Sequence, residues 1–259
     1  MQVWVALGVA VWALALAAPA DAQGTFERVW VDANVGVAIA AQDTFTMSAP
    51  VDRFVEPAEV AAHYRLPRAP SFDVGAGVMI TRTIGSGASF DASMHEHAAE
   101  LRAQLPHPLF ADAAATDVAE TDPVMQRIER SLSLHAMVVV AQTRRLRLRV
   151  FGGPIRYRVE QDAVDAITYN HIYFVRQPTN IVQLTGFDYA RVDGSGWGGH
   201  VGADASLFLT RIFGVGVFAK YDRGRVALDN PLAAGLGHPD RVTITAGGLQ
   251  VGGGVRLKF

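Results

Sequence analysis

Cysteine is absent from the 259 residues of this chain. The absence excludes disulfides, thiolate metal ligands, a cysteine nucleophile and a lipid anchor attached to cysteine. The chain also has no long basic tract and a formal net charge of -2, which argues against a nucleic-acid partner. Its function must therefore be inferred from the pattern of apolar and polar residues along the chain.

Only one hydrophobic run is long enough for a membrane-spanning helix, and it covers residues 3–18. The run is followed by Ala20-Asp21-Ala22, which fits the small-x-small pattern of a signal-peptide cleavage site. We therefore expect residues 1–22 to be a cleaved secretory signal and residues 23–259 to form one barrel domain. The first two residues carry no positive charge, so an uncleaved membrane anchor is the alternative.

The last stretch of the chain, residues 242–259, ends in phenylalanine, and from Leu249 onward one set of alternate positions is apolar and the other is polar or glycine. Period-two alternation predicts a β-strand with one apolar face. That face carries Leu249, Val251, Gly253, Val255, Leu257 and Phe259. A terminal strand that ends in an aromatic residue is typical of bacterial outer-membrane barrels.

The same alternation recurs along the chain and predicts eight strands. They are 31–39, 72–80, 88–94, 132–140, 146–159, 197–209, 213–221 and 242–259. The predicted connections alternate between long and short, with long loops at 41–70, 98–129, 161–195 and 230–240 and tight turns at 85–87, 143–145 and 210–212. This spacing predicts an all-β, eight-stranded antiparallel up-and-down transmembrane barrel with short periplasmic turns and long extracellular loops.

The fifth strand changes the parity of its apolar residues within its own length. Leu146, Leu148 and Val150 occupy one face, whereas Ile155 and Tyr157 occupy the other. We expect a β-bulge between them at Gly152-Gly153-Pro154, because an inserted residue reverses the two faces.

The polar faces carry a balanced set of charges that would point into the barrel. These are Asp32, Asp73, Asp91, Arg147, Arg149, Asp204, Lys220 and Arg256. Eight strands enclose little more than side chains, so we expect the charges to pair and plug the lumen. A charged constriction that passes small solutes is the alternative. The glycines of the same faces are expected to make room for the basic side chains: Gly75, Gly77, Gly202, Gly214, Gly216, Gly252 and Gly254.

Catalytic, cofactor and metal sites are not expected. His95 and His97 share a strand face, with Glu96 opposite, but no third ligand stands at a recognisable spacing. The chain has no G-x-S-x-G motif, which weakens the hypothesis of a lipid-modifying hydrolase. Aromatic residues near strand ends fit either interfacial girdles or ordinary packing: Trp30, Tyr157, Trp197, Phe213 and Tyr221.

Three segments carry a family resemblance, FGGPIRYRVEQD at 151–162, FGVGVFAKYDRG at 213–224 and GGLQVGGGVRLKF at 247–259. The mature chain resembles the outer-membrane-protein β-barrel domain family, the small OmpA-like and OmpX-like barrels. The resemblance implies a monomeric, non-enzymatic barrel in the bacterial outer membrane, in contact with its lipid and with a structural or surface-interaction role. It also implies that the barrel-assembly machinery reads Phe259 and that loops hold any surface ligand. A narrow channel for small or hydrophobic solutes and a lipid-modifying enzyme remain alternatives.

Overall fold

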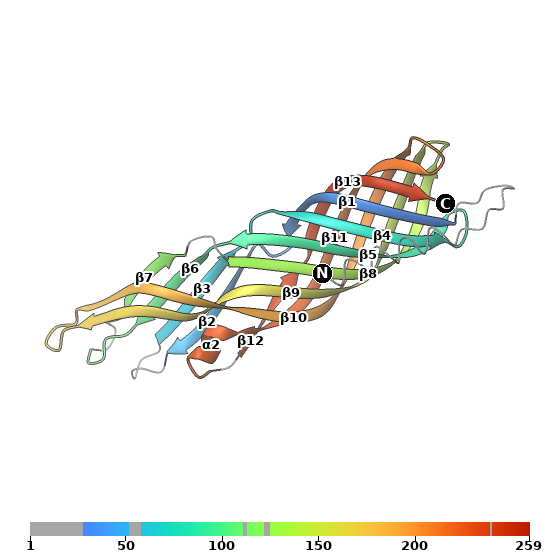
Figure 1. Ribbon diagram of the computed structural model, residues 1–259. Coiled ribbons are helices and arrows are strands. Elements are labelled where there is room, and N and C mark those ends of the chain that lie inside the picture. The colour runs from blue at the N-terminus through green and yellow to red at the C-terminus, as the bar shows by residue number, and fades with distance from the viewer. Residues whose placement is uncertain (1–27, 52–57, 111–112, 122–124, 239) are drawn as a thin grey trace.

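A computed structural model describes residues 28–51, 58–110, 113–121, 125–238 and 240–259, and the expected signal at 1–22 lies outside these residues (Figure 1). Eight strands close into one ring in sequence order. They are β1 (Val29–Ala40), β4 (Ala69–Met79), β5 (Ile84–His97), β8 (Met125–Gln142), β9 (Leu146–Tyr173), β10 (Asn180–Phe208), β11 (Phe213–Asn230) and β13 (Gly248–Lys258). Antiparallel pairing of β1 with β13 closes the ring, so the predicted eight-stranded barrel is confirmed.

Three tight turns join the strands at the end of the barrel where β13 finishes. In each turn a threonine hydroxyl accepts a hydrogen bond from the backbone N–H of the third residue after it. The accepting threonines are Thr81 (2.9 Å), Thr143 (3.0 Å) and Thr210 (2.9 Å). The turn predicted at 85–87 is wrong, because these residues lie inside β5. A Cβ on Gly87 would lie 2.5 Å from the ring of Trp30, so this glycine makes room for an indole.

The opposite end of the barrel continues into regular structure where long loops were predicted. The first two of these regions contain a separate antiparallel sheet in the order β2-β3-β6-β7. Its strands are β2 (Thr44–Val51), β3 (Ala58–Arg65), β6 (Ala99–Leu105) and β7 (Ala115–Glu120). Prolines in this region do not prevent a sheet, because Pro50 lies on the edge strand β2, where a missing N–H is tolerated.

The other two predicted loops are also structured. Region 161–195 is the continuation of β9 and β10, which remain paired up to Tyr173 and Asn180. Region 230–240 contains the short helix α2 (Pro231–Gly235) and leads into β12 (Asp240–Ala246), which pairs with β11. No helix among the described residues is long and apolar enough to cross a membrane. The four elongated connections together form a cap at the end of the ring opposite the tight turns, at the lower left of Figure 1.

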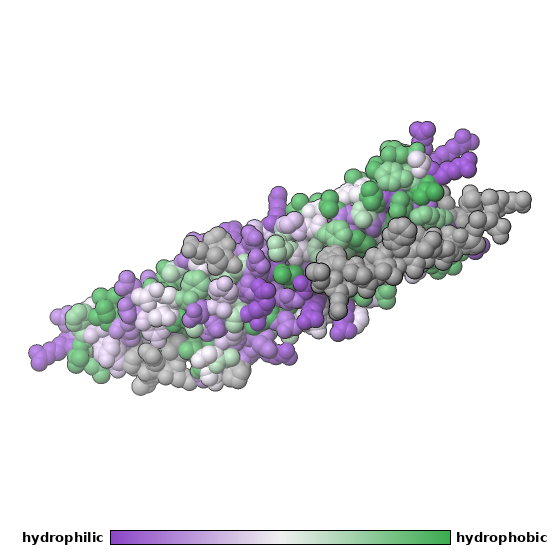
Figure 2. All heavy atoms as spheres, viewed as in Figure 1, coloured by the Kyte–Doolittle hydropathy of each residue, from purple (hydrophilic) through white to green (hydrophobic). Residues whose placement is uncertain are grey.

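The outer surface of the ring is apolar along every strand, and Figure 2 shows hydrophobic residues gathered near β1 and β13. Across the described strands, no outward position carries a charge within 29–39, 70–80, 84–94, 132–140, 146–154, 197–209, 213–221 and 249–259. Val35, Val201 and Val217 are each more than 60% exposed on this surface. We call it the apolar belt, and its spans have the length that tilted strands need to cross hydrocarbon.

The cap has the reverse polarity, with apolar side chains inside. Its core includes Phe45, Tyr64, Met125 and Leu228. The predicted bulge at 152–154 is therefore wrong. Side chains of β9 alternate without interruption from Leu146 to Val159, and only their surroundings change as the strand passes from the belt into the cap. A bulge does occur, but it lies on β8 between Val139 and Ala141, beside a tight turn.

Candidate functional site: the barrel interior

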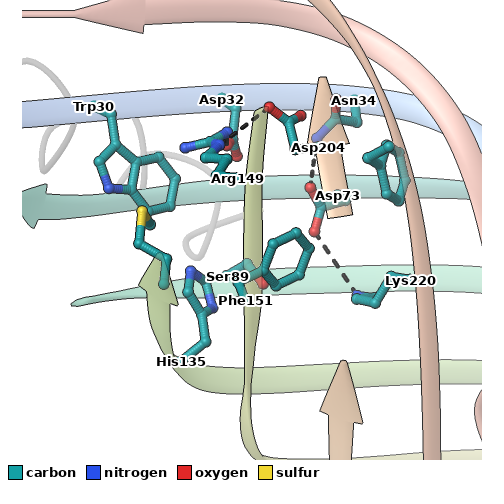
Figure 3. A pocket seen from close by; sticks show the side chains of 12 residues that line it. Trp30, Asp32, Asn34, Asp73, Ser89, His135, Arg149, Phe151, Asp204 and Lys220 are labelled. Carbon is teal, nitrogen blue, oxygen red and sulfur yellow. Dashed lines mark hydrogen bonds and ion pairs between the residues drawn. The ribbon is translucent and has the colours of Figure 1, made fainter. Parts of the chain in front are cut away.

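All eight charged residues predicted to face the lumen are buried, with 8% or less of their surface exposed. They come from β1, β4, β5, β9, β10, β11 and β13, and alternation along each strand turns them inward. Figure 3 shows several of them pointing into one space, with Trp30 and His135 on one side and Lys220 on the other. Seven of the eight take part in two connected clusters of ion pairs.

The first cluster is centred on Arg149. Its Nη2 lies 2.7 Å from Oδ2 of Asp32, and its Nε lies 3.0 Å from Oδ1 of Asp204. Arg256 donates its Nε to the other oxygen of Asp204 at 2.8 Å, and its Nη1 donates to Oδ1 of Asn34 at 2.5 Å. The guanidinium of Arg149 therefore joins the carboxylate of its cross-strand neighbour on β10 to a carboxylate of β1, which is not adjacent to β9 in the ring.

The second cluster is centred on Lys220. Its ammonium contacts Asp91 and lies 3.9 Å from Asp73 and 3.7 Å from Asp222. Asn34 links the two clusters, because its Nδ2 donates to Oδ1 of Asp73 at 2.6 Å. One cation thus faces three carboxylates.

Arg147 lies apart from these clusters. Its guanidinium carbon is 5.4 Å from the centre of the Phe208 ring, and Nζ of Lys258 is 4.0 Å from the same ring. These three residues lie near the tight turns.

Little empty space remains between the interior side chains. In the described part of the barrel, a cavity bounded by Trp30, Arg149, Asp204 and Lys220 has a volume of about 30 Å³. Another, beside Arg147, measures about 10 Å³. A water molecule needs roughly 10–15 Å³ by the same kind of measure, so these cavities hold one or two waters.

A small apolar cluster lies in the barrel below the ion pairs. It contains Trp30, Met79, Met137 and Val139, with Phe151 packed against them. The indole of Trp30 is 4% exposed and lies 4.6 Å from the Arg149 guanidinium, so of the two interpretations given above, packing and not an interfacial girdle applies to this residue.

The other aromatic residues divide between the two sides of the barrel wall. Tyr157 is 2% exposed and lies in the cap core, so packing applies to this residue as well. Trp197, Phe213 and Tyr221 do lie on the outer surface.

The lumen glycines make room chiefly for aromatic rings and backbone, which differs from the prediction. A Cβ on Gly77 would meet Trp30, one on Gly202 would meet Phe151, and one on Gly252 would lie 2.9 Å from Phe218. Only Gly216, whose Cβ would lie 2.9 Å from Nε of Arg256, faces a basic side chain as expected. Rings and neighbouring backbone, more often than long cations, therefore occupy the space beside these glycines.

The histidine pair of β5 is buried at the boundary between ring and cap. Nδ1 of His95 lies 2.8 Å from the carbonyl oxygen of Pro67, and Nε2 of His97 lies 2.7 Å from the side-chain nitrogen of Gln161. No group of three or more histidine, aspartate or glutamate side chains suited to a metal ion occurs among the residues described.

Sequence reasoning missed several interior groups near the cap. Asp222 follows the predicted end of its strand, while Arg127 and Glu129, which pair at 2.6 Å, fall in a predicted loop. Asp222 and Glu129 accept the N–H groups of Gly248 and Gly247, at 2.8 and 2.9 Å, where the chain kinks between β12 and β13. Gly247 has a φ of 87°, which explains the glycine.

Above the belt, Asp162 connects the two longest strands. Nε of Arg191 donates to its Oδ1 at 2.7 Å, and the backbone N–H of Gln126 donates to its Oδ2 at 3.0 Å. Burial opposes the charged form of Asp162, but these hydrogen bonds outweigh it and hold the pKa of the carboxyl below its ordinary value.

Neither the family models nor the curated proteins compared with this chain give a match. Among solved structures, the chain is similar to the outer membrane protein OprG from Pseudomonas aeruginosa, at 12% identity and a TM-score of 0.49, over 92% of this chain and 99% of that one. It is similar to the outer membrane protease OmpT from Escherichia coli at 11% identity and 0.48, over 93% and 99%. It is also similar to the attachment invasion locus protein Ail of Yersinia pestis at 10% identity and 0.36, over 90% and 100%.

The chain is thus structurally similar to small bacterial outer-membrane barrels. With identities of 12% or less and TM-scores below 0.5, these similarities carry no conclusion about activity. The fold itself is established by the strand order and register.

Proposed function

We propose that this chain is a non-conducting, monomeric β-barrel of the bacterial outer membrane that anchors its cap outside the cell. The apolar belt is the observation that carries the proposal. In water, uncharged outward faces on eight strands would expose far more apolar surface than a soluble monomer tolerates. In a bilayer, the same faces meet lipid and the closed ring leaves no unpaired strand edge.

The proposal assigns the remaining features accordingly. The tight turns lie on the periplasmic side, the mature chain begins near Gln23 after signal cleavage, and the assembly machinery reads Phe259. The barrel belongs with the small OmpA-like and OmpX-like barrels and has no enzymatic activity. Lipid of the outer membrane is its first partner, and nucleic acid is not one.

The packed interior supports a plug over a pore. Arg149 contacts carboxylates of β1 and β10, and Lys220 contacts a carboxylate of β5. The cavities among them hold about one or two waters. A selective pore usually presents rings of one charge sign. Single-channel recording in planar bilayers tests this, and we expect no steady conductance from the wild-type protein. Stable openings would establish the narrow channel instead.

A surface-interaction role is favoured by the tip of the β9–β10 hairpin. Ile172, Phe174 and Val175 are each about half or more exposed there, although the tip lies far from the apolar belt. His107 holds a neighbouring loop against this tip, with Nε2 at 3.1 Å from the carbonyl oxygen of Phe174. A cell-binding assay with Phe174→Ser and Val175→Ser in a surface-displayed protein tests the role, and unchanged binding would count against it.

A lipid-modifying enzyme is the remaining alternative. Mass analysis of outer-membrane lipids from cells with and without the gene tests it, and the proposal expects identical lipid profiles.

A further inference from the structure

The outer face of the barrel carries a groove immediately above the apolar belt. Its volume is about 840 Å³, and it crosses the outward faces of β8, β9, β10 and β11. Four arginines line it, Arg130, Arg156, Arg158 and Arg241, together with Asp193 and the apolar side chains Phe90 and Leu132. The groove is therefore basic on its cap side and apolar on its belt side.

Strand register extends the basic surface beside Trp197. Trp197 is 65% exposed and pairs with Arg156 on one side and Arg225 on the other. Arg223, two residues nearer the belt on β11, pairs with Gly199. Two strand spacings separate Arg156 from Arg225, a distance of roughly 10 Å, which two flexible arginine side chains can close around one phosphate group.

Three of these six arginines, the four in the groove and the two on β11, have acidic partners. Arg158 lies 3.7 Å from Asp193, and Arg241 lies 2.8 Å from Asp229. Arg130 pairs with Glu160.

The other three arginines, Arg156, Arg223 and Arg225, are exposed. Among the residues that the structure describes, none of them has a carboxylate within 4.0 Å. The guanidinium carbon of Arg156 lies 5.5 Å from the centre of the Trp197 ring, which orients this cation at the edge of the belt. Three uncompensated cations therefore surround one tryptophan at the expected depth of lipid headgroups.

We propose that this surface, the Trp197 site, binds the phosphomonoester headgroup of an anionic membrane lipid. The proposal rests on the transmembrane function proposed above. Arg156, Arg223 and Arg225 would hold the phosphate oxygens, since a guanidinium fork matches phosphate geometry. The acyl chains would lie along the belt below, past Phe90, Leu132 and Val201. A soluble anion would use the cations alone, whereas a lipid uses the basic and the apolar sides of the groove together.

Trp197 provides the readout. After removal of the expected signal, the chain keeps only two tryptophans, Trp30 and Trp197, so Trp30→Phe leaves a single emitter at the site. The Trp30→Phe protein is reconstituted into phosphatidylcholine vesicles that contain a tenth of brominated phosphatidic acid or, in parallel, a tenth of brominated phosphatidylcholine. Bromine quenches tryptophan emission on contact, so the ratio of the two quenching signals reports enrichment of the phosphomonoester lipid around Trp197.

The expected result is several-fold stronger quenching by brominated phosphatidic acid. Replacing Arg156, Arg223 and Arg225 with glutamine should weaken the enrichment by about a hundredfold in apparent affinity, and hence abolish it at this lipid fraction. A matched control removes three exposed arginines from the tight turns, Arg144, Arg145 and Arg211, and should keep the enrichment.

Two results would overturn the inference. One is equal quenching by both lipids, and the other is equal loss of enrichment in the control variant. Insertion is monitored separately by the heat-sensitive gel mobility of a folded barrel. If the protein folds and inserts but phosphatidic acid is not enriched around it, only the proposed Trp197 site is refuted. If the protein fails to insert, the transmembrane proposal is refuted together with the site.

Discussion

Arg149 gives the sharpest test of the interior, because it is the only cation within 4.0 Å of Asp32 among the described residues. Replacing Arg149 with methionine leaves Asp32 buried without a partner, while Asp204 keeps Arg256. Breaking one side of a buried ion pair costs about 3 to 5 kcal/mol when water does not reach the remaining charge. We expect Arg149→Met to lower the free energy of unfolding by about that amount.

Arg158→Gln is the control. Arg158 lies on the same strand, but its ion pair with Asp193 is 65% exposed on both sides and is worth at most about 1 kcal/mol. The double variant Arg149→Met with Asp32→Asn should recover much of the lost stability, since it removes the stranded charge. Urea unfolding in phosphatidylcholine vesicles, followed by gel mobility, measures all four proteins.

The reasoning fails if the two arginine variants lose the same stability, below about 1 kcal/mol, and the Asp32→Asn change restores nothing. That outcome would mean that water fills the lumen and screens its charges. Planar-bilayer recordings of Arg149→Met would then be expected to show current, whereas a packed interior predicts near silence.

Three further predictions concern the belt, the cap and assembly. Arginine introduced at the outward positions Val35, Val138 or Val217 should cost about 2 to 4 kcal/mol in vesicle unfolding, and equal costs at inward positions would contradict the face assignment. Because the pKa of Asp162 is lowered on folding, its stabilisation is full above the unfolded pKa of about 3.9 and is lost as pH falls through the folded value. Arg191 is 53% exposed, so the effect is below about 1 kcal/mol. Arg191→Gln should reduce this acid sensitivity in protease protection of the β9–β10 hairpin, while the hydrogen bond from Gln126 remains. Deleting Phe259 should reduce the amount of assembled barrel in cells without changing the unfolding of barrel refolded in vitro, and normal membrane levels would refute this.

The sequence was sufficient for the ring because each spanning strand alternates through most of its apolar span, and the bulge on β8 lies at the end of that span beside a tight turn. The odd or even position of a residue such as Val35 or Asp204 is enough to assign it to the lipid or the lumen side, because apolar side chains face lipid and polar side chains face the lumen. The cap could not be predicted in this way. Its strands place apolar residues inward, so Tyr157 and Ile155 have the same parity as Arg149 but lie in a different environment.

The glycines and the interior aromatic residues show a second limit. The sequence predicts Gly87 to lie in a turn and Gly77 to make room for a basic side chain. Both glycines instead leave space for the indole of Trp30, which belongs to a different strand. The register between strands decides which side chain fills the space beside a glycine. Alternation within a single strand does not specify that register. For the same reason Asn34, which links the two charge clusters, was not foreseen.

The pairing of β9 with β10 along nearly their whole length, with register shifts only between Leu184 and Gly186 and between Asp188 and Tyr189, has a mechanical consequence. These strands, of 28 and 29 residues, run from the tight turns to the tip of the cap, a length of roughly 90 Å. A pull applied at the tip along the strand axis would load their ladder in shear, so that many hydrogen bonds resist together and none is peeled open first. The cap is thus a rigid extension of the barrel strands and not a domain joined by a flexible linker. It would hold a bound partner at a fixed height and transmit tension directly into the barrel wall.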